Sequence, residues 1–214
     1  MIASGLLQAI GVSLRTSGLA ALVASLLAVP AALFLSGRDF RGKRLVLLVN
    51  QTWMAAPTVV IGLLFYFLLS RSGPLGRLGL LYTQTAMTVG QVFLILPLIT
   101  GFSYTALRQV DRRARLTALT LGASRRQAGW VVLREAKFAL IVAVLAGFAR
   151  AVSEVGIAMM LGGNIRGATR NITTAIALET AKGEFTTGIV LGAILLAITL
   201  GINVLVQVGL RSKD

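Results

Sequence analysis

The sequence contains neither cysteine nor histidine, and each absence removes a class of chemistry. Without cysteine the chain has no disulfide and no thiol nucleophile. Without histidine it lacks the commonest side-chain base near neutral pH and the commonest ligand of transition metals. The phosphate-binding pattern G-x-x-x-x-G-K-[ST] and the serine-nucleophile pattern G-x-S-x-G are also missing. We therefore expect no catalytic residue, no metal ion and no cofactor on this chain.

Charged residues are scarce as well, at 13% of the chain, whereas hydrophobic residues make up 56% and the mean hydropathy is +0.85. A soluble domain carries about 25% charged residues, so this composition indicates a protein that crosses a membrane several times. The net charge of +14 would suggest nucleic acid in a soluble protein. Here the basic residues lie between apolar runs, as they do at the cytoplasmic ends of membrane spans. We expect contact with membrane lipid and no nucleic acid.

Five apolar segments are long enough to cross a bilayer, which requires about 20 helical residues. The sequence predicts an all-α polytopic membrane protein with a single transmembrane domain over residues 1–214. Residues 2–14 are apolar but too short to cross, and we expect them to form an interfacial helix. The predicted spans are about 16–37, 45–70, 78–107, 138–160 and 185–210.

The basic residues also predict which way the chain crosses the membrane. Five spans place the loop 38–44, residues 108–137 and the C-terminal tail on one side, and this side carries twice as many basic residues as the other. Positive charge is enriched on the cytoplasmic side. We therefore expect a multi-pass protein of the cell membrane, with its N-terminus outside and its C-terminus in the cytoplasm.

The first three predicted spans each contain one proline: Pro30, Pro57 and Pro97. A proline inside a helix frees a carbonyl and bends the helix. Two interpretations stay open at this point. The bends are either irregularities of packing, or they mark helices that line a pathway.

Residues 108–137 form a polar segment between the third and fourth spans. Their spacing predicts a short helix that ends at Gly122, where glycine can adopt a positive φ, and a second helix whose N-cap is Ser124. Two short helices joined by a tight turn at the membrane surface are shaped to fit a groove of another protein.

Residues 117–124, with the sequence TALTLGAS, resemble the E-A-A-x-x-x-G-A loop of ABC importer permeases. In that family the loop docks on the ATP-hydrolysing subunit, so the resemblance implies a coupling loop. Leu116 stands where the family usually has glutamate. Arg134 stands where many members have proline, which suggests that this segment runs unbroken into the fourth span. The coupling residues implied are Thr117, Ala118, Gly122, Ala123 and Ser124.

Residues 150–184 resemble the permeases of the molybdate, tungstate and sulfate group, and the tungstate type above all. The matching pattern begins at Glu154 and continues through Asn164, Gly167 and Arg170. The resemblance implies an importer that works by alternating access on an oxyanion, with tungstate first and molybdate second. It also implies a homodimer of this chain, two ABC ATPase subunits that bind the ATP, and an extracytoplasmic oxyanion-binding protein.

Arg150 and Glu154 are spaced to form an i,i+4 ion pair inside the fourth span. Charges inside a bilayer are costly and seldom face lipid. The pair is either a structural contact within the bundle, or Arg150 attracts an anion while Glu154 tunes or gates its passage. Gln91, which lies deep in the third span, is a further candidate for the pathway, whereas Asn50 and Gln51 are expected to bond between helices.

Asn164, Arg166 and Arg170 follow Gly162 and Gly163, which should end the fourth span on the outer side. They form either a solvated loop or the surface on which the binding protein docks. Two alternatives to an importer remain: an energy-independent anion channel or carrier with Arg150 and Glu154 as its filter, and a membrane-embedded enzyme. The enzyme is disfavoured because the acidic residues are scattered along the sequence, and a channel leaves residues 108–137 without a role.

Overall fold

The computed structural model describes the backbone of residues 2–211 and the side chains of residues 5–111 and 113–204. Every regular element in this described part is helical, which confirms the all-α prediction. In chain order the elements are α1 (Ile2–Gly37), α2 (Lys43–Met54), α3 (Thr58–Leu69), the 3-10 turn η1 (Gly76–Leu78), α4 (Gln84–Gln109), α5 (Arg112–Thr120), α6 (Arg125–Glu135), α7 (Lys137–Val152), α8 (Gly156–Gly162), α9 (Ile172–Ala181) and α10 (Phe185–Arg211). Met1 and the tail 212–214 lie outside the described residues.

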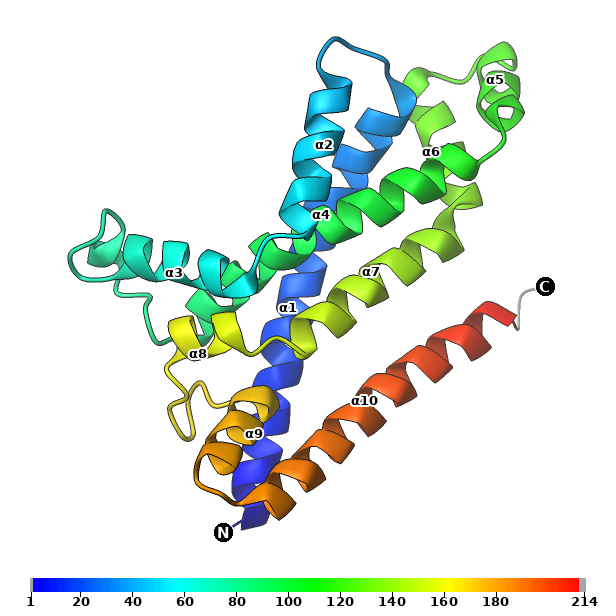
Figure 1. Ribbon diagram of the computed structural model, residues 1–214. Coiled ribbons are helices and arrows are strands. Elements are labelled where there is room, and N and C mark those ends of the chain that lie inside the picture. The colour runs from blue at the N-terminus through cyan, green and yellow to red at the C-terminus, as the bar shows by residue number, and fades with distance from the viewer. Residues whose placement is uncertain (1, 212–214) are drawn as a thin grey trace.

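Helix α1 is the longest element and forms the centre of the bundle with α4 (Figure 1). A fully buried alanine recurs at every fourth position, and these small side chains let the two helices approach closely. With 36 residues, α1 is about 54 Å long at 1.5 Å per residue, well beyond the roughly 30 Å of a bilayer core. The buried alanines are Ala20, Ala24, Ala28 and Ala32.

The prediction of a separate interfacial helix over residues 2–14 is wrong, because these residues are the first turns of α1. The exposed Arg15 does not interrupt the helix. A long arginine side chain can extend toward water while its helix continues through the membrane boundary. The charge of Arg15 therefore does not coincide with the end of a helix.

Among the residues that the structure describes, three helices are long and apolar enough to cross a membrane, namely α1, α4 and α10. Two further segments consist of paired helices: α2 and α3 meet at 96°, and α7 and α8 meet at 60°. The expected second and fourth spans are therefore broken. By length and composition, the described residues contain three candidate membrane spans, or as many as five if each bent pair crosses once.

Only one of the three prolines in the expected spans breaks its helix. Pro57 is the N-cap of α3 and has a ψ of 127°, which turns the chain away from the axis of α2. Pro30 and Pro97 lie inside α1 and α4, which continue through them. At Pro97, the side-chain amide of Asn50 donates to the proline's own carbonyl at 3.0 Å, which confirms the expected bond between helices.

The polar segment folds as two short helices, as expected. Gly122 has a φ of +86° at the turn, and the hydroxyl of Ser124 accepts the backbone N–H of Gln127, whose side chain accepts the N–H of Ser124. This capping box fixes the start of α6. The expectation that the segment runs unbroken into the fourth span is wrong, because α6 ends at Glu135 and α7 begins after the single residue Ala136.

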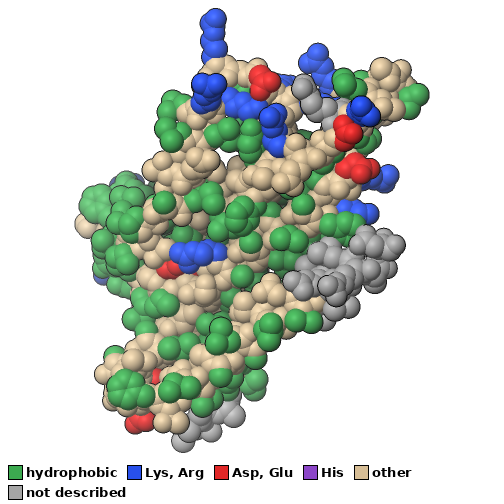
Figure 2. All heavy atoms as spheres, turned by 45° about the vertical axis from the view of Figure 1, so that its right-hand side comes forward, with side chains coloured by type: hydrophobic (Ala, Val, Ile, Leu, Met, Phe, Trp, Pro, Cys, Tyr) green, Lys and Arg blue, Asp and Glu red, His purple; other side chains and the backbone are tan. Residues whose placement is uncertain are grey.

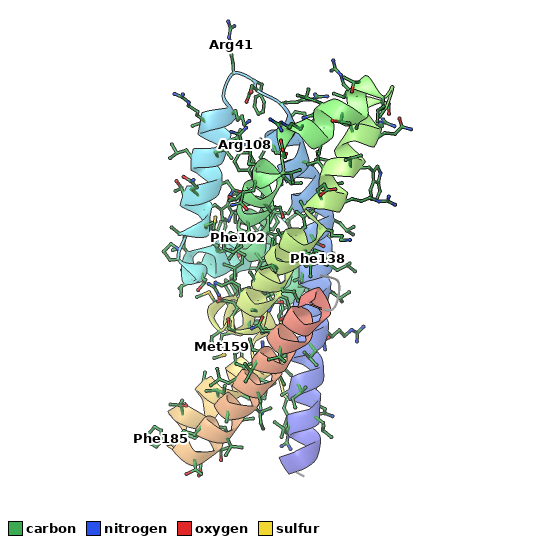
Figure 3. All side chains as sticks on the ribbon, turned by 90° about the vertical axis from the view of Figure 1, so that its right-hand side faces the viewer. Arg41, Phe102, Arg108, Phe138, Met159 and Phe185 are labelled. Carbon is green, nitrogen blue, oxygen red and sulfur yellow. The ribbon has the colours of Figure 1, made fainter. Side chains whose placement is uncertain are left out.

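The chain turns back after α8 at Gly163, which has a φ of +67° and ends that helix as expected. Helix α9 then packs on the start of α10, and α10 makes few other contacts with the bundle (Figure 1). Lysine and arginine side chains gather at the end of the molecule that carries α5 and α6 (Figure 2). Arg41 and Arg108 lie toward this end, Phe185 lies at the opposite end, and Met159 lies between them (Figure 3).

Candidate translocation and docking sites

The hairpin of α5 and α6 holds all five residues of the expected coupling loop. The N–H of Leu121 donates to Thr117 O and that of Ala123 donates to Ala118 O, both at 3.0 Å. These bonds close the end of α5 around the left-handed Gly122. The turn is thus fixed by its own backbone.

The hairpin presents apolar side chains to its surroundings. Leu121 is 83% exposed and Trp130 is 66% exposed, whereas Val132 on the same hairpin is buried against α1 and α4. Large apolar side chains beside many arginines form a surface suited to a protein partner.

Arg115 attaches the hairpin to the rest of the bundle, and sequence reasoning did not single it out. Its guanidinium donates to the carbonyl of Gly37 at 3.1 Å, at the last residue of α1. The last carbonyls of a helix lack partners within the helix and attract cations. In the sequence Arg115 is only one basic residue among several, and no pattern there predicts its contact with Gly37.

Arg150 and Glu154 form the expected ion pair, with Arg150 Nη1 2.7 Å from Glu154 Oε2. They do not share one helix as expected, because α7 ends at Val152 and Glu154 lies in the break before α8. The other carboxylate oxygen accepts the backbone N–H of Ile157 at 3.2 Å. Glu154 is 3% exposed, whereas the Arg150 side chain is 37% exposed. The carboxylate is therefore enclosed, and the guanidinium reaches the surface of this subunit.

Gln91 meets the same break from α4. It is fully buried, and its side-chain amide donates to the carbonyl of Ala151 at 3.1 Å, in the last turn of α7. Its Oε1 atom has no hydrogen-bond partner among the described residues. The structure thus brings the three pathway candidates together at one break, where Gln91 is enclosed and Arg150 is accessible.

The break between α7 and α8 also lies beside the break between α2 and α3. A Cβ atom on Gly156 would lie 3.3 Å from both Glu154 Oε1 and the hydroxyl of Thr58. Thr58 is the first residue of α3. The two broken helices therefore meet where their direction changes.

The loop of residues 163–171, named the outer loop here because the sequence predicts that it lies outside, is held by its own side chains. Arg170 donates to the side-chain oxygen of Asn164 at 3.0 Å and to its carbonyl at 3.3 Å, and Asn164 has a φ of +51°. Gln84 donates to the carbonyl of Ala168 at 2.6 Å. Of the three docking candidates, Arg166 is exposed, whereas Asn164 and Arg170 bind each other.

A cavity of about 580 Å³ opens beside this loop, between α3 and α8. The hydroxyls of Tyr66 and Tyr82 lie 3.5 Å apart at its edge. The hydrogen bond with Tyr66 raises the pKa of the Tyr82 hydroxyl above its ordinary value. Within the described residues, no three acidic side chains are grouped so that they could hold a metal ion. The cavity is lined by Leu63, Tyr66, Tyr82, Met159, Met160, Gly163 and Ile165.

Long apolar helices, two bent helix pairs that meet and an exposed helical hairpin are typical of a multi-pass membrane protein. The sequence matches, over residues 6–211, the family described as the inner membrane component of binding-protein-dependent transport systems. The chain belongs to this family.

Curated relatives agree with this assignment. A probable anion ABC transporter permease protein of Haloferax volcanii is 42% identical over 95% of this chain and 88% of its own length. The tungstate uptake system permease protein TupB of Peptoclostridium acidaminophilum is 39% identical over 91% of this chain and 85% of its own. The resemblance to tungstate-type ABC permeases is thereby confirmed.

The fold is also found in a crystal structure of an amino acid ABC transporter with histidines. That structure matches with a TM-score of 0.71 and covers 99% of this chain and 95% of its own. The two sequences are 16% identical, so the likeness concerns the fold alone.

Proposed function

We propose that this chain is the membrane-spanning subunit of an ATP-driven ABC importer for an oxyanion, with tungstate the first candidate and molybdate the second. The observation that carries the proposal is the similarity to tungstate uptake permeases over most of the chain, including a 40% identical TupB of Campylobacter jejuni. Permeases named for molybdenum and sulfate are more distant, at 31% and 28% identity.

In this proposal each bent pair crosses the membrane once, so the chain has five spans with its N-terminus outside and its C-terminus in the cytoplasm. The strongly basic end with α5 and α6 then faces the cytoplasm, in agreement with the positive-inside rule. Two copies of the chain assemble with two ABC ATPase subunits and an extracytoplasmic oxyanion-binding protein.

The hairpin residues from Thr117 to Ser124 dock on the ATPase, and the loop with Arg166 at its tip receives the binding protein. Arg150 faces the route of the anion, and Glu154 holds its guanidinium in place. A carboxylate on its own would repel a doubly negative oxyanion, and the ion pair removes that repulsion. Gln91 of α4 stabilises the same break through its hydrogen bond to Ala151 O.

Uptake of radiolabelled tungstate into proteoliposomes tests the proposal. With this chain, its ATPase and its loaded binding protein present, we expect uptake that requires ATP on the ATPase side. Tungstate uptake that proceeds equally without ATP and without the binding protein would support the alternative, an energy-independent channel or carrier. Parallel assays with molybdate and sulfate rank the substrates.

A further inference from the structure

Thr173 ties the outer part of the molecule to the break that carries the ion pair. It lies in the first turn of α9, is 3% exposed, and its hydroxyl donates to the backbone carbonyl of Glu154 at 2.8 Å. The two residues are 19 positions apart in the sequence. This hydrogen bond therefore closes a ring of chain that runs through α8 and the outer loop.

The segment inside this ring is held together by hydrogen bonds of its own side chains. Thr169 accepts the N–H of Ile165 at 3.0 Å and donates to the carbonyl of Gly162, while Arg170 holds Asn164. These short hydrogen bonds connect the residues on either side of Arg166 and lead directly to the start of α9. A displacement of the exposed Arg166 would thus displace α8 and α9 together.

The chain on the other side of the hydrogen bond is the break between two helices. Residues 153–155 lie between α7 and α8, outside any helix, and a break of this kind can absorb a change of direction. The carboxylate of Glu154, which holds Arg150, is carried by this segment. Movement of the segment therefore changes where the guanidinium points.

The hydroxyl of Thr173 has a second acceptor within reach. The side-chain oxygen of Asn171 lies 2.9 Å away, nearly as close as Glu154 O. A hydroxyl has one proton and can rotate between two acceptors. When the hydroxyl leaves Glu154 O, it can therefore donate to Asn171 Oδ1 and does not become a buried donor without an acceptor. The hydroxyl thus has an acceptor in both states, whereas the carbonyl of Glu154 is bound by Thr173 in only one of them.

We infer that Thr173 is a positioning residue that couples the outer loop to the Arg150–Glu154 ion pair by exchanging its acceptor between Glu154 O and Asn171 Oδ1. The inference rests on the proposed function, in which a loaded binding protein docks on the outer loop. Docking shifts the outer loop with α8 and α9, the hydroxyl turns to Asn171, and the break is free to reorient Arg150.

A unique cysteine reports the motion, because the chain has none of its own. Ser153 is exposed in the break and bonds only to carbonyls of its own chain at positions 149 and 150. In the assembled complex with Ser153→Cys, we would measure the rate of maleimide labelling on this chain, with and without the loaded binding protein. ATPase activity of the same samples is the second readout.

Thr173→Val keeps the shape of the side chain but removes the donor, whereas Thr173→Ser keeps the donor. We expect loaded binding protein to change the rate of labelling at position 153 severalfold in the parent Ser153→Cys complex and with Thr173→Ser added, and by less than half that factor with Thr173→Val. Basal ATPase activity should be equal in all three. Thr105→Val is the control, since its exposed hydroxyl bonds only to Gly101 O in its own helix.

Should valine lower the yield of complex, Thr173→Ala removes the donor without adding a methyl group at the hydroxyl position. A normal response in the donor-free variants, with a responsive parent, overturns the inference and leaves the proposed function intact. A parent whose labelling and ATPase activity both ignore the loaded binding protein contradicts the proposed function, and the inference with it.

Discussion

The hairpin of α5 and α6 and the break around Glu154 are both polar interruptions in an apolar chain, but they are built in opposite ways. The hairpin is fixed by its own caps and exposes Leu121 and Trp130. The break has little local structure, and side chains of other helices enclose its carboxylate, so that Glu154 is only 3% exposed. An exposed, self-sufficient turn suits a contact with another protein, and an enclosed one suits the positioning of a charge.

The partners of the two regions show the same difference. Gln91 reaches the break from α4 and Thr173 reaches it from α9. The hairpin has one cross-bundle hydrogen bond among the described side chains, from Arg115 to Gly37 O. Substitutions of the buried residues around Glu154 should therefore affect both folding and transport, whereas substitutions in the hairpin should affect transport alone.

Removal of the Arg150 charge is the largest expected effect. Arg150→Met leaves a buried carboxylate without its partner, which costs on the order of 3 kcal/mol, the low end of the usual range because Arg150 is partly exposed. We expect a lower melting temperature of the purified complex and tungstate uptake reduced at least a hundredfold. The double variant Arg150→Met with Glu154→Gln should regain stability but not uptake. Uptake restored in the double variant would show that Arg150 serves structure only.

Gly122→Val should disable the hairpin without affecting the bundle. The left-handed conformation costs a branched residue about 1–2 kcal/mol, but no atom lies within 4 Å of the added Cβ, so the strain stays in the turn. We expect uptake at least tenfold lower and an unchanged melting temperature. Gly42→Val is the matched control, with a φ of +92° and the same open surroundings outside the hairpin. Equal uptake in both variants would contradict a coupling role for the hairpin.

Gly90→Ala should disturb the break through its packing. The new Cβ would lie 2.6 Å from side-chain methyl groups of Ile157 and Leu161, so these buried side chains or α8 itself must shift. Overpacking of this kind costs about 1–3 kcal/mol, which thermal unfolding of the complex would detect. Gly192→Ala, with nothing within 4 Å of its Cβ, should be neutral or slightly stabilising. Equal melting temperatures would show that α8 is loosely held.

The smallest effect is expected at the exposed ion pair of α9. Lys182 lies 2.9 Å from Glu179, and its side chain is 51% exposed. An exposed pair contributes about 0–1 kcal/mol, so Lys182→Ala should leave uptake unchanged and barely shift the melting temperature. A large loss of uptake would place a binding-protein contact here, rather than on the loop around Arg166.

Features set by neighbouring residues were predictable from the sequence. Gly122, Ser124 and Gly163 end or begin helices through their own backbone and side-chain preferences, and each was expected. The apolar runs likewise indicated where long helices form. These signals are local, so a single sequence contains them.

Features set by contacts between distant residues were not predictable. The stretch from Arg150 to Glu154 contains no glycine or proline, so an unbroken helix was expected. In the structure, Gln91 and Thr173 bind backbone carbonyls at the break, and both lie far away in the sequence. The prolines show the same limit, because Pro57 separates two helices whereas α4 continues through Pro97.

The most direct test of the account is the ATPase activity of the reconstituted complex in the presence of its binding protein, loaded in turn with tungstate, molybdate or sulfate. The account predicts that an ATPase copurifies with this chain, that the loaded binding protein stimulates it, and that tungstate gives the largest stimulation. If no ATPase copurifies and no loaded form stimulates hydrolysis, the hairpin of α5 and α6 is not a coupling element. The proposal of an ATP-driven importer would then be wrong.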